Sequence, residues 1–131
     1  VYLFNANNNA YGSYQPRYNQ TLSQFADLVK LIGNYEHYST IDLYYQSDMT
    51  IKNAVKFKRL KDSVSGQYQN IKYPDWIGKP FHPGIDEYPY PVEAIGYTYD
   101  GLHPSDKGYQ VIADMLIKIF KKDGYITVAA N

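Results

Sequence analysis

Hydrophobic residues recur at helical spacing in two segments of the chain. The later segment follows Pro104-Ser105-Asp106, a helix start signal, and carries six apolar residues on one face between positions 111 and 120. Lys118, Lys121 and Lys122 suit the C-terminal end of its dipole, and Gly124 is its expected end. The earlier predicted helix ends at Gly33, and its apolar face consists of Leu22, Phe25, Ala26, Val29 and Ile32.

Two shorter apolar segments predict strands on either side of the first helix. Val1–Phe4 is a short apolar run, and Thr40–Tyr45 combines alternation with β-forming residues. A strand, a helix and a strand joined by short connections are typical of the βαβ unit of a parallel sheet. Between positions 46 and 99 the pattern weakens, although 51–60 favours a short helix. Five of the seven prolines fall within 73–91, which predicts a structured surface loop or lid; the alternatives are a loop packed over the sheet and a subunit contact.

Length and charge narrow the classes of protein. The chain has 131 residues, enough for one domain. Its 13 basic and 13 acidic residues balance, which argues against binding nucleic acid or an anionic membrane. No run approaches the roughly 20 apolar residues of a membrane span. No signal peptide is visible, which says little because the sequence starts within an apolar run.

Two features of the composition bear on chemistry. Cysteine is absent, which excludes disulfides and thiolate metal sites. The 16 tyrosines suit sugar-facing surfaces or protein interfaces.

The sharpest chemical signal is Asp100-Gly101-Leu102-His103-Pro104. An Asp three residues before a His can place its carboxylate against the imidazole Nδ1, which fixes the tautomer and leaves Nε2 as a general base. Pro104 restricts His103 to extended geometry and lets a helix begin after it. The alternative is a helix-entry turn in which Asp100 caps backbone amides and His103 is incidental.

The same block, followed by Gly108-Tyr109 and an amphipathic helix, resembles the last block of the SGNH (GDSL) family of serine hydrolases. There, the D-x-x-H-P block supplies the Asp and His of a Ser-His-Asp triad, so the resemblance implies that Asp100 and His103 are catalytic. Val1–Phe4, Tyr18-Asn19 and Ile41–Tyr44 resemble the fourth strand, the next helix and the fifth strand of that fold. The resemblance is specific at 100–120 and looser at 1–45, and 46–99 looks like a variable insertion.

Three other blocks of that family have no counterpart in the sequence. These are the Gly-Asp-Ser nucleophile turn, the oxyanion Gly and the Gly-x-Asn-Asp turn. Gln46-Ser47-Asp48 lacks the Gly and follows the wrong strand. Asn5–Asn8 echoes the third block, and its role as the oxyanion block is the alternative to the fourth-strand interpretation, which the following helix and strand favour. The resemblance therefore implies the C-terminal half of an α/β protein, a three-layer flavodoxin-like α/β/α sandwich around a parallel sheet. We expect residues 1–131 to form one part of a single domain, completed by an N-terminal half as a separate chain or segment.

Secondary candidates lie in the loops. His82 in Phe81-His82-Pro83, with Asp86 four residues on, imitates the catalytic block without a following helix and is interpreted as loop structure. His37 is predicted to be exposed. The histidines lack metal-ligand spacing, so neither a metal nor another cofactor is expected. The residues expected to contact substrate are Asn7, Asn8, Tyr11 and Trp76.

The leading function is ester hydrolysis, with removal of acetyl or other small acyl groups from carbohydrate as the preferred reaction. The serine would come from the missing half. The alternative is a non-catalytic SGNH-like module of a phage tail or cell-surface protein that binds polysaccharide. Either function suits a secreted, cell-surface or virion-associated protein, and a cytoplasmic location stays open.

Overall fold

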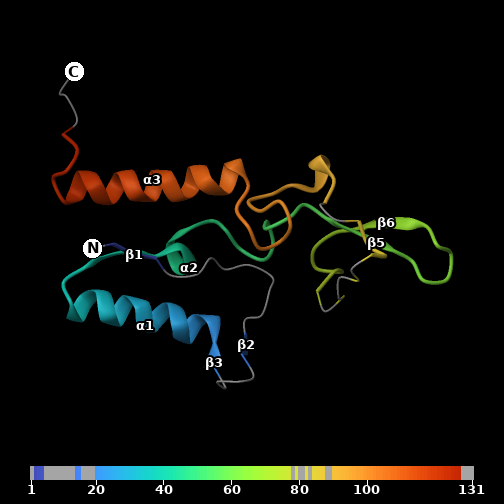
Figure 1. The fold of residues 1–131 in the computed structure, drawn as a ribbon, viewed down its shortest axis with the longest axis horizontal. Coiled ribbons are helices and arrows are strands. Elements are labelled where there is room, and N and C mark those ends of the chain that lie inside the picture. The colour runs from blue at the N-terminus through green and yellow to red at the C-terminus, as the bar shows by residue number, and fades with distance from the viewer. Residues whose placement is uncertain are drawn as a thin grey trace. The chain divides into compact units, whose positions relative to one another are not determined.

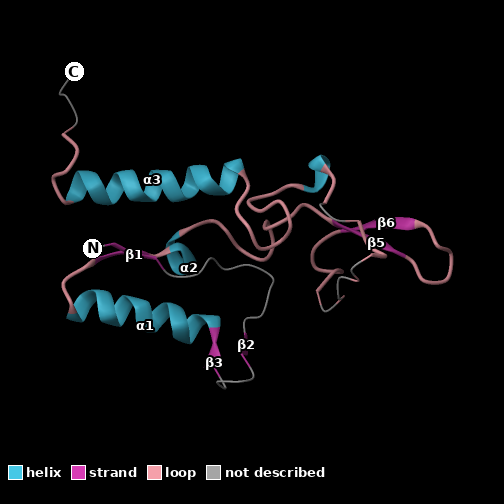
Figure 2. Cartoon of the chain, viewed as in Figure 1, coloured by secondary structure: helices cyan, strands magenta, loops and turns pink. Residues whose placement is uncertain are grey.

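The computed structural model describes residues 2–4, 14–15, 20–77, 79, 82, 84–87 and 90–127. These residues divide into two compact units (Figures 1 and 2). The first unit holds the described residues up to Asp48 and those from Tyr109 onward. The second unit holds the described residues from Met49 to Gly108. The chain is of mixed α and β composition, as the hydrophobic pattern predicts.

The first unit contains the predicted βαβ arrangement. Strand β1 (Tyr2–Phe4) pairs in parallel with β4 (Ser39–Ile41), and helix α1 (Leu22–Tyr35) lies between them in the chain. The register joins Leu3 to Thr40. A small antiparallel pair, β2 (Tyr14–Gln15) with β3 (Gln20–Thr21), precedes α1 and was not predicted. The wider parallel sheet and the three-layer sandwich stay predictions.

The first helix extends beyond its predicted end. Gly33 lies inside α1, so its prediction as the stop is wrong. A Cβ there would come within 2.2 Å of Thr40 Oγ1, so the glycine is needed for the close approach of β4. His37 instead takes the left-handed conformation that ends the helix, with φ of 57°, and the Tyr38 amide donates to the Gly33 carbonyl at 2.8 Å. His37 is exposed, as predicted.

The second predicted strand is shorter than expected. It ends at Ile41 rather than Tyr45, because Asp42 begins the short helix α2 (Leu43–Gln46). The Asp42 side chain accepts a hydrogen bond from the Tyr45 amide at 3.1 Å, which is the usual action of an N-cap residue. Its other oxygen lies 2.9 Å from Lys30 Nζ on α1. Two polar contacts thus override the β-forming preference of 43–45.

The second unit contains a hairpin where a helix was predicted. Residues 51–53 form a turn, Val55 bridges to Ile95, and β5 (Lys58–Lys61) pairs with antiparallel β6 (Tyr68–Ile71). The helix predicted within 51–60 is therefore wrong. A short 3₁₀ helix, η2 (Val92–Ala94), follows the proline-rich segment, whose described residues form turns as expected. Val55, Tyr90 and Ala94 form the buried core, with Phe57 packed against it.

The last helix agrees with its prediction. Helix α3 (Asp106–Lys122) has Ser105 before it, Lys121 and Lys122 in its last turn, and Gly124 with φ of 79° after it. Of its residues only Gly108 is buried, so the predicted apolar face stays partly exposed within the described chain. None of the helices in the described ranges has the length and apolar character that crossing a bilayer requires.

Candidate active site

The loop from Thr98 to Pro104 is closed by its own hydrogen bonds. The Tyr99 amide donates to the His103 carbonyl at 3.2 Å, and Thr98 and Pro104 form an isolated bridge. Gly101, with φ of 88°, adopts the left-handed conformation that reverses the chain at little cost for glycine. Thr98 is 1% exposed, and its hydroxyl accepts from the Gly101 amide at 2.9 Å. These hydrogen bonds thus fix the conformation of the loop.

Asp100 and His103 are hydrogen-bonded within this loop. Asp100 Oδ2 lies 2.5 Å from His103 Nδ1, as predicted. Asp100 Oδ1 accepts from the amides of Leu102 at 2.9 Å and His103 at 2.7 Å. The residue therefore satisfies both interpretations of the motif, because one oxygen holds the turn and the other holds the ring. Asp100 is 6% exposed, whereas 58% of the His103 side chain is exposed.

The contacts of Asp100 keep it ionised. Burial alone would raise its pKa, but hydrogen bonds from the His103 ring and from the His103 and Leu102 amides outweigh burial and lower the pKa below its ordinary value. A carboxylate can only accept, so Nδ1 must carry the proton that it shares with Oδ2. In neutral His103 the lone pair is then on Nε2, the atom that a general base uses.

Sequence reasoning overlooked two residues that support the histidine. The Tyr99 ring stacks on the His103 ring, with centroids 5.7 Å apart and planes 15° apart. Thr98 links the loop to the rest of the unit, because its hydroxyl also donates to the Ala54 carbonyl at 2.7 Å. Tyr99 adjoins the motif and could have been suspected. The role of Thr98 depends on a partner 44 residues away, which no local pattern reveals.

The start of α3 anchors the other end of the loop. The Ser105 hydroxyl donates to the Gly96 carbonyl at 2.7 Å and accepts from the Gly108 amide at 3.3 Å. The Ser105 amide donates to the Tyr97 carbonyl at 2.9 Å. Gly108 lies so close to Tyr97 that a Cβ would come within 2.2 Å of the carbonyl oxygen. His103 is therefore held between two segments that are each fixed by backbone contacts.

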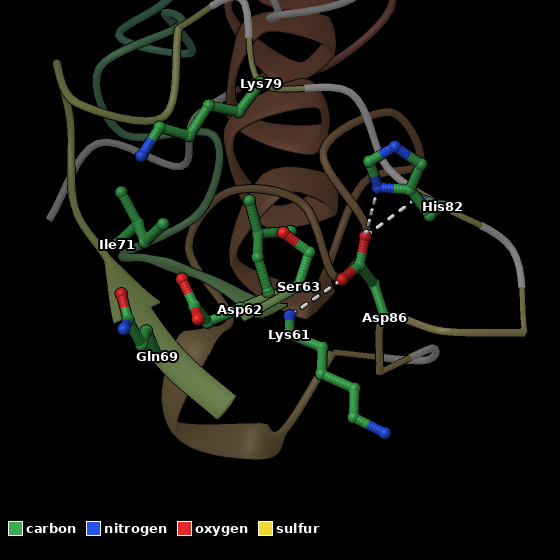
Figure 3. A pocket seen from close by; sticks show the side chains of 9 residues that line it. Lys61, Asp62, Ser63, Gln69, Ile71, Lys79, His82 and Asp86 are labelled. Carbon is green, nitrogen blue, oxygen red and sulfur yellow. Dashed lines mark hydrogen bonds and ion pairs between the residues drawn. The ribbon is translucent and has the colours of Figure 1, made fainter. Parts of the chain in front are cut away.

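A second His–Asp pair occurs in the second unit. His82 Nδ1 lies 3.3 Å from Asp86 Oδ2, which also accepts from the His82 amide at 2.7 Å (Figure 3). Asp86 Oδ1 accepts from the Lys61 amide at 2.9 Å, so this carboxylate fastens its loop to β5. Ser63 lines the same pocket, but within the described ranges no hydrogen bond joins it to His82. The pair therefore stabilises the loop, in agreement with its interpretation from the sequence as loop structure.

The Asp62-Ser63 dipeptide beside this pair forms a turn. Asp62 Oδ1 accepts from the amides of Val64 at 3.1 Å and Ser65 at 2.7 Å, and from the Ser65 hydroxyl at 2.9 Å. These bonds lower the pKa of Asp62, chiefly through Ser65. The turn joins β5 to β6, so this Asp-Ser is part of a hairpin and lacks the surroundings of a nucleophile.

The residues expected to contact substrate are described only in part. Asn7, Asn8 and Tyr11 lie outside the described residues. Trp76 is 2% exposed, so the expectation that its ring contacts substrate is wrong. The ring instead packs in the interior of the second unit, with Lys58 Nζ 4.5 Å from its centroid and Tyr73 edge-on to it. No group of three or more metal-ligating side chains gathers in the described part of the chain.

Comparison with known proteins gives one informative similarity. No protein-family model and no curated protein matches the chain. Among solved structures, it is similar to "a possible lipase from Chitinophaga pinensis DSM 2588", with 43% identity and a TM-score of 0.81. The similarity covers 95% of this chain and 53% of that one, so the chain spans about half of that structure's length. The two proteins therefore share the α/β arrangement over nearly all of this chain.

Proposed function

We propose that this chain is the Asp–His part of a serine ester hydrolase of the SGNH/GDSL type. The observation that carries the proposal is the hydrogen bond between buried Asp100 and exposed His103 in a rigid loop. The 43% identity to a protein described as a possible lipase adds support for ester chemistry. In the proposed domain, β1, β4, α1 and α3 belong to a three-layer α/β/α sandwich with a parallel sheet.

The proposed reaction uses His103 as the general base and acid. A serine Oγ attacks the acyl carbon while its proton moves to His103 Nε2. The ester C–O bond then breaks, and His103 returns the proton to the departing oxygen to give an alcohol. Water repeats the sequence on the acyl-enzyme and releases the acid. Asp100 holds the tautomer and stabilises the imidazolium at both stages, and backbone amides elsewhere hold the oxyanion.

We place the serine on another part of the hydrolase domain. Within the described ranges, no serine hydroxyl is hydrogen-bonded to His103. Within the described residues of the first unit, β1 and β4 form a two-stranded sheet, and large apolar side chains of α1 are exposed. A completing half that adds strands beside β1 or β4 would cover these surfaces. The large apolar residues exposed on α1 are Leu28 (48%), Leu31 (64%), Ile32 (44%) and Tyr35 (81%).

The test compares the chain alone with a completed domain. The chain alone should not hydrolyse p-nitrophenyl acetate. A chimera in which this chain replaces the aligned part of the Chitinophaga protein should hydrolyse p-nitrophenyl acetate. Its serine should also react with a fluorophosphonate. His103→Ala should lower kcat of the chimera by about 10⁴-fold or more. The matched control His82→Ala changes the other His–Asp pair and should leave kcat unchanged.

Two results would contradict the proposal. One is wild-type kcat in the His103→Ala chimera. The other is turnover by the chain alone that depends on one of its own serines. If a folded chimera has no esterase activity but binds polysaccharide saturably, the non-catalytic binding module replaces the enzyme. In that case His103→Ala should leave binding intact.

The preferred substrate is an acylated carbohydrate, and the proposed location is secreted, cell-surface or virion-associated. This preference rests on the family resemblance and on the tyrosine-rich composition, since 16 of 131 residues are tyrosine. Acetate release from acetylated xylan, compared with hydrolysis of a long-chain triglyceride, tests it. Faster release from the triglyceride at matched ester concentration would refute the carbohydrate preference and leave the ester hydrolase standing.

A further inference from the structure

Four lysines from three stretches of the second unit line one cavity. The cavity has a volume of about 490 Å³ and lies beside the turn that precedes β5. Lys107 comes from the first turn of α3 and lies four residues after His103. Phe57 and Gly96 contribute apolar and backbone surface. The complete lining is Lys52, Asn53, Val55, Lys56, Phe57, Lys72, Gly96 and Lys107.

These lysines have no acidic partner in the described ranges. All four are exposed, and none forms an ion pair with a described carboxylate. Within the described part of the chain, Lys107 Nζ contacts the Tyr97 ring, whose centroid lies 4.2 Å away. The chain as a whole has a formal charge of zero, so the positive charge in this cavity is local. Like charges around one cavity repel, and an anion placed among them relieves that repulsion.

The cavity wall is held by backbone hydrogen bonds. The Lys56 amide donates to the Ala94 carbonyl at 2.7 Å, and the Tyr97 amide donates to the Asn53 carbonyl at 3.1 Å. Gly96 fits against this segment so closely that a Cβ would come within 2.4 Å of the Asn53 carbonyl oxygen. The segments that carry Lys52, Lys56 and Lys107 are thus joined to one frame, and that frame continues into the loop of Asp100 and His103.

We propose that this cavity binds the negatively charged groups of an acidic saccharide chain. The proposal rests on the proposed function, because the choice of a saccharide follows from the carbohydrate preference, whereas the choice of an anion follows from the lysines. Several ammonium groups in one cavity with the apolar Phe57 suit a chain whose charges are spaced along it. Carboxylate and sulfate groups share this chemistry, and the apolar faces of sugar rings can lie against Phe57.

Binding to the 131-residue chain tests this inference without any need for catalysis. Tetragalacturonate, a sulfated galactose tetrasaccharide and neutral galactotetraose are titrated by calorimetry at low and high salt. We expect both acidic probes to bind, with affinity that falls as salt rises, and the neutral probe to bind at least about tenfold more weakly. Lys56→Gln/Lys107→Gln should weaken acidic binding about tenfold. The matched control, Lys79→Gln/Lys118→Gln, removes two lysine charges elsewhere in the chain and should leave acidic binding unchanged.

The outcomes are distinct. Equal affinity for neutral and acidic probes, or equal loss in the Lys79→Gln/Lys118→Gln control, overturns the site. Tighter binding of an oligodeoxythymidylate through the same lysines overturns the saccharide assignment. Where the acidic probes bind as expected, comparison of the carboxylate probe with the sulfate probe identifies the preferred charged group. If the completed chimera lacks esterase activity while the lysine variants still lose acidic binding, the proposed function fails and the site stands. If the chimera has esterase activity but shows no preference for acidic probes over the neutral one, the proposed function stands and the anion site fails.

Discussion

Changing Asp100 to Asn tests the interpretation of the site at a single atom. Both carboxylate oxygens are used: Oδ1 accepts from two backbone amides, and Oδ2 lies 2.5 Å from His103 Nδ1. Asn has only one acceptor oxygen. If that oxygen keeps the two amides, the side-chain NH₂ group faces Nδ1. Since NH₂ can only donate, the imidazole must accept there, and its proton moves to Nε2.

The predicted loss of activity follows from that tautomer. Nε2 carrying a proton cannot accept another from a serine, so the base is blocked in the ground state. In a serine hydrolase with this arrangement, the same substitution lowers kcat by about 10⁴-fold with the geometry intact. At 1.36 kcal/mol per factor of ten, this corresponds to about 5 kcal/mol of transition-state stabilisation. The turn itself should persist, because Oδ1 retains the Leu102 and His103 amides.

Two measurements separate the steps of this reasoning. Nitrogen-15 NMR of the neutral imidazole should show His103 protonated at Nδ1 in the wild type and at Nε2 in Asp100→Asn. Turnover of the completed chimera should fall in parallel. Asp86→Asn is the matched control, because it changes the environment of His82 and should leave His103 unaffected. A wild-type His103 protonated at Nε2, or full activity in Asp100→Asn, would refute the reasoning.

Substitutions at three further positions test the packing and hydrogen bonding of the second unit. Gly108→Ala should destabilise the chain by about 1–3 kcal/mol in urea unfolding, since contact with the Tyr97 carbonyl outweighs a helix-propensity gain of about 1 kcal/mol. Trp76→Ala should lower the free energy of unfolding by about 3–5 kcal/mol. Trp76→Phe should lower it less, because Phe keeps a ring and removes an Nε1 that has no hydrogen-bond partner in the described ranges. Burial would raise the pKa of Asp86, but its bonds to Lys61 and His82 outweigh burial and lower it. The resulting stabilisation is complete above the unfolded pKa of about 3.9 and is lost as pH falls through the lower folded value, so Asp86→Asn should flatten the acid side of the stability–pH curve.

Local sequence patterns predicted the elements whose causes are local. Helix α3 has its start signal, apolar spacing and terminal glycine between Pro104 and Gly124, and all are present as expected. The Asp100–His103 bond was predictable for the same reason, because both partners lie in one turn and Pro104 restricts the chain beside them. The parallel pairing of β1 and β4 followed from the βαβ pattern.

Distant contacts caused most of the errors. The strand predicted over 40–45 is an exception, because it is cut short by a local N-cap bond from the Tyr45 amide to Asp42, together with the pairing of Asp42 with Lys30 on α1. The helix predicted within 51–60 was wrong because Val55 pairs with Ile95, forty residues later, and β5 pairs with β6. Trp76 suggested an exposed substrate contact by residue type alone, but burial depends on what surrounds a side chain. The role of Thr98 was missed for the same reason.

The double use of Asp100 explains why the motif is both structural and chemical. A helix-entry turn needs an acceptor for its free amides, and a catalytic histidine needs an acceptor for Nδ1. Here one carboxylate does both, so the geometry that begins the turn also sets the ring. An Asp that served the turn alone would leave the ring free to rotate, and an Asp that served the ring alone would leave two amides without partners. Because the Tyr99 ring also stacks on the His103 ring, His103 has one well-defined orientation with more than half of its side chain exposed. A ring held in this way is suited to transferring a proton to or from a group that another part of the domain provides.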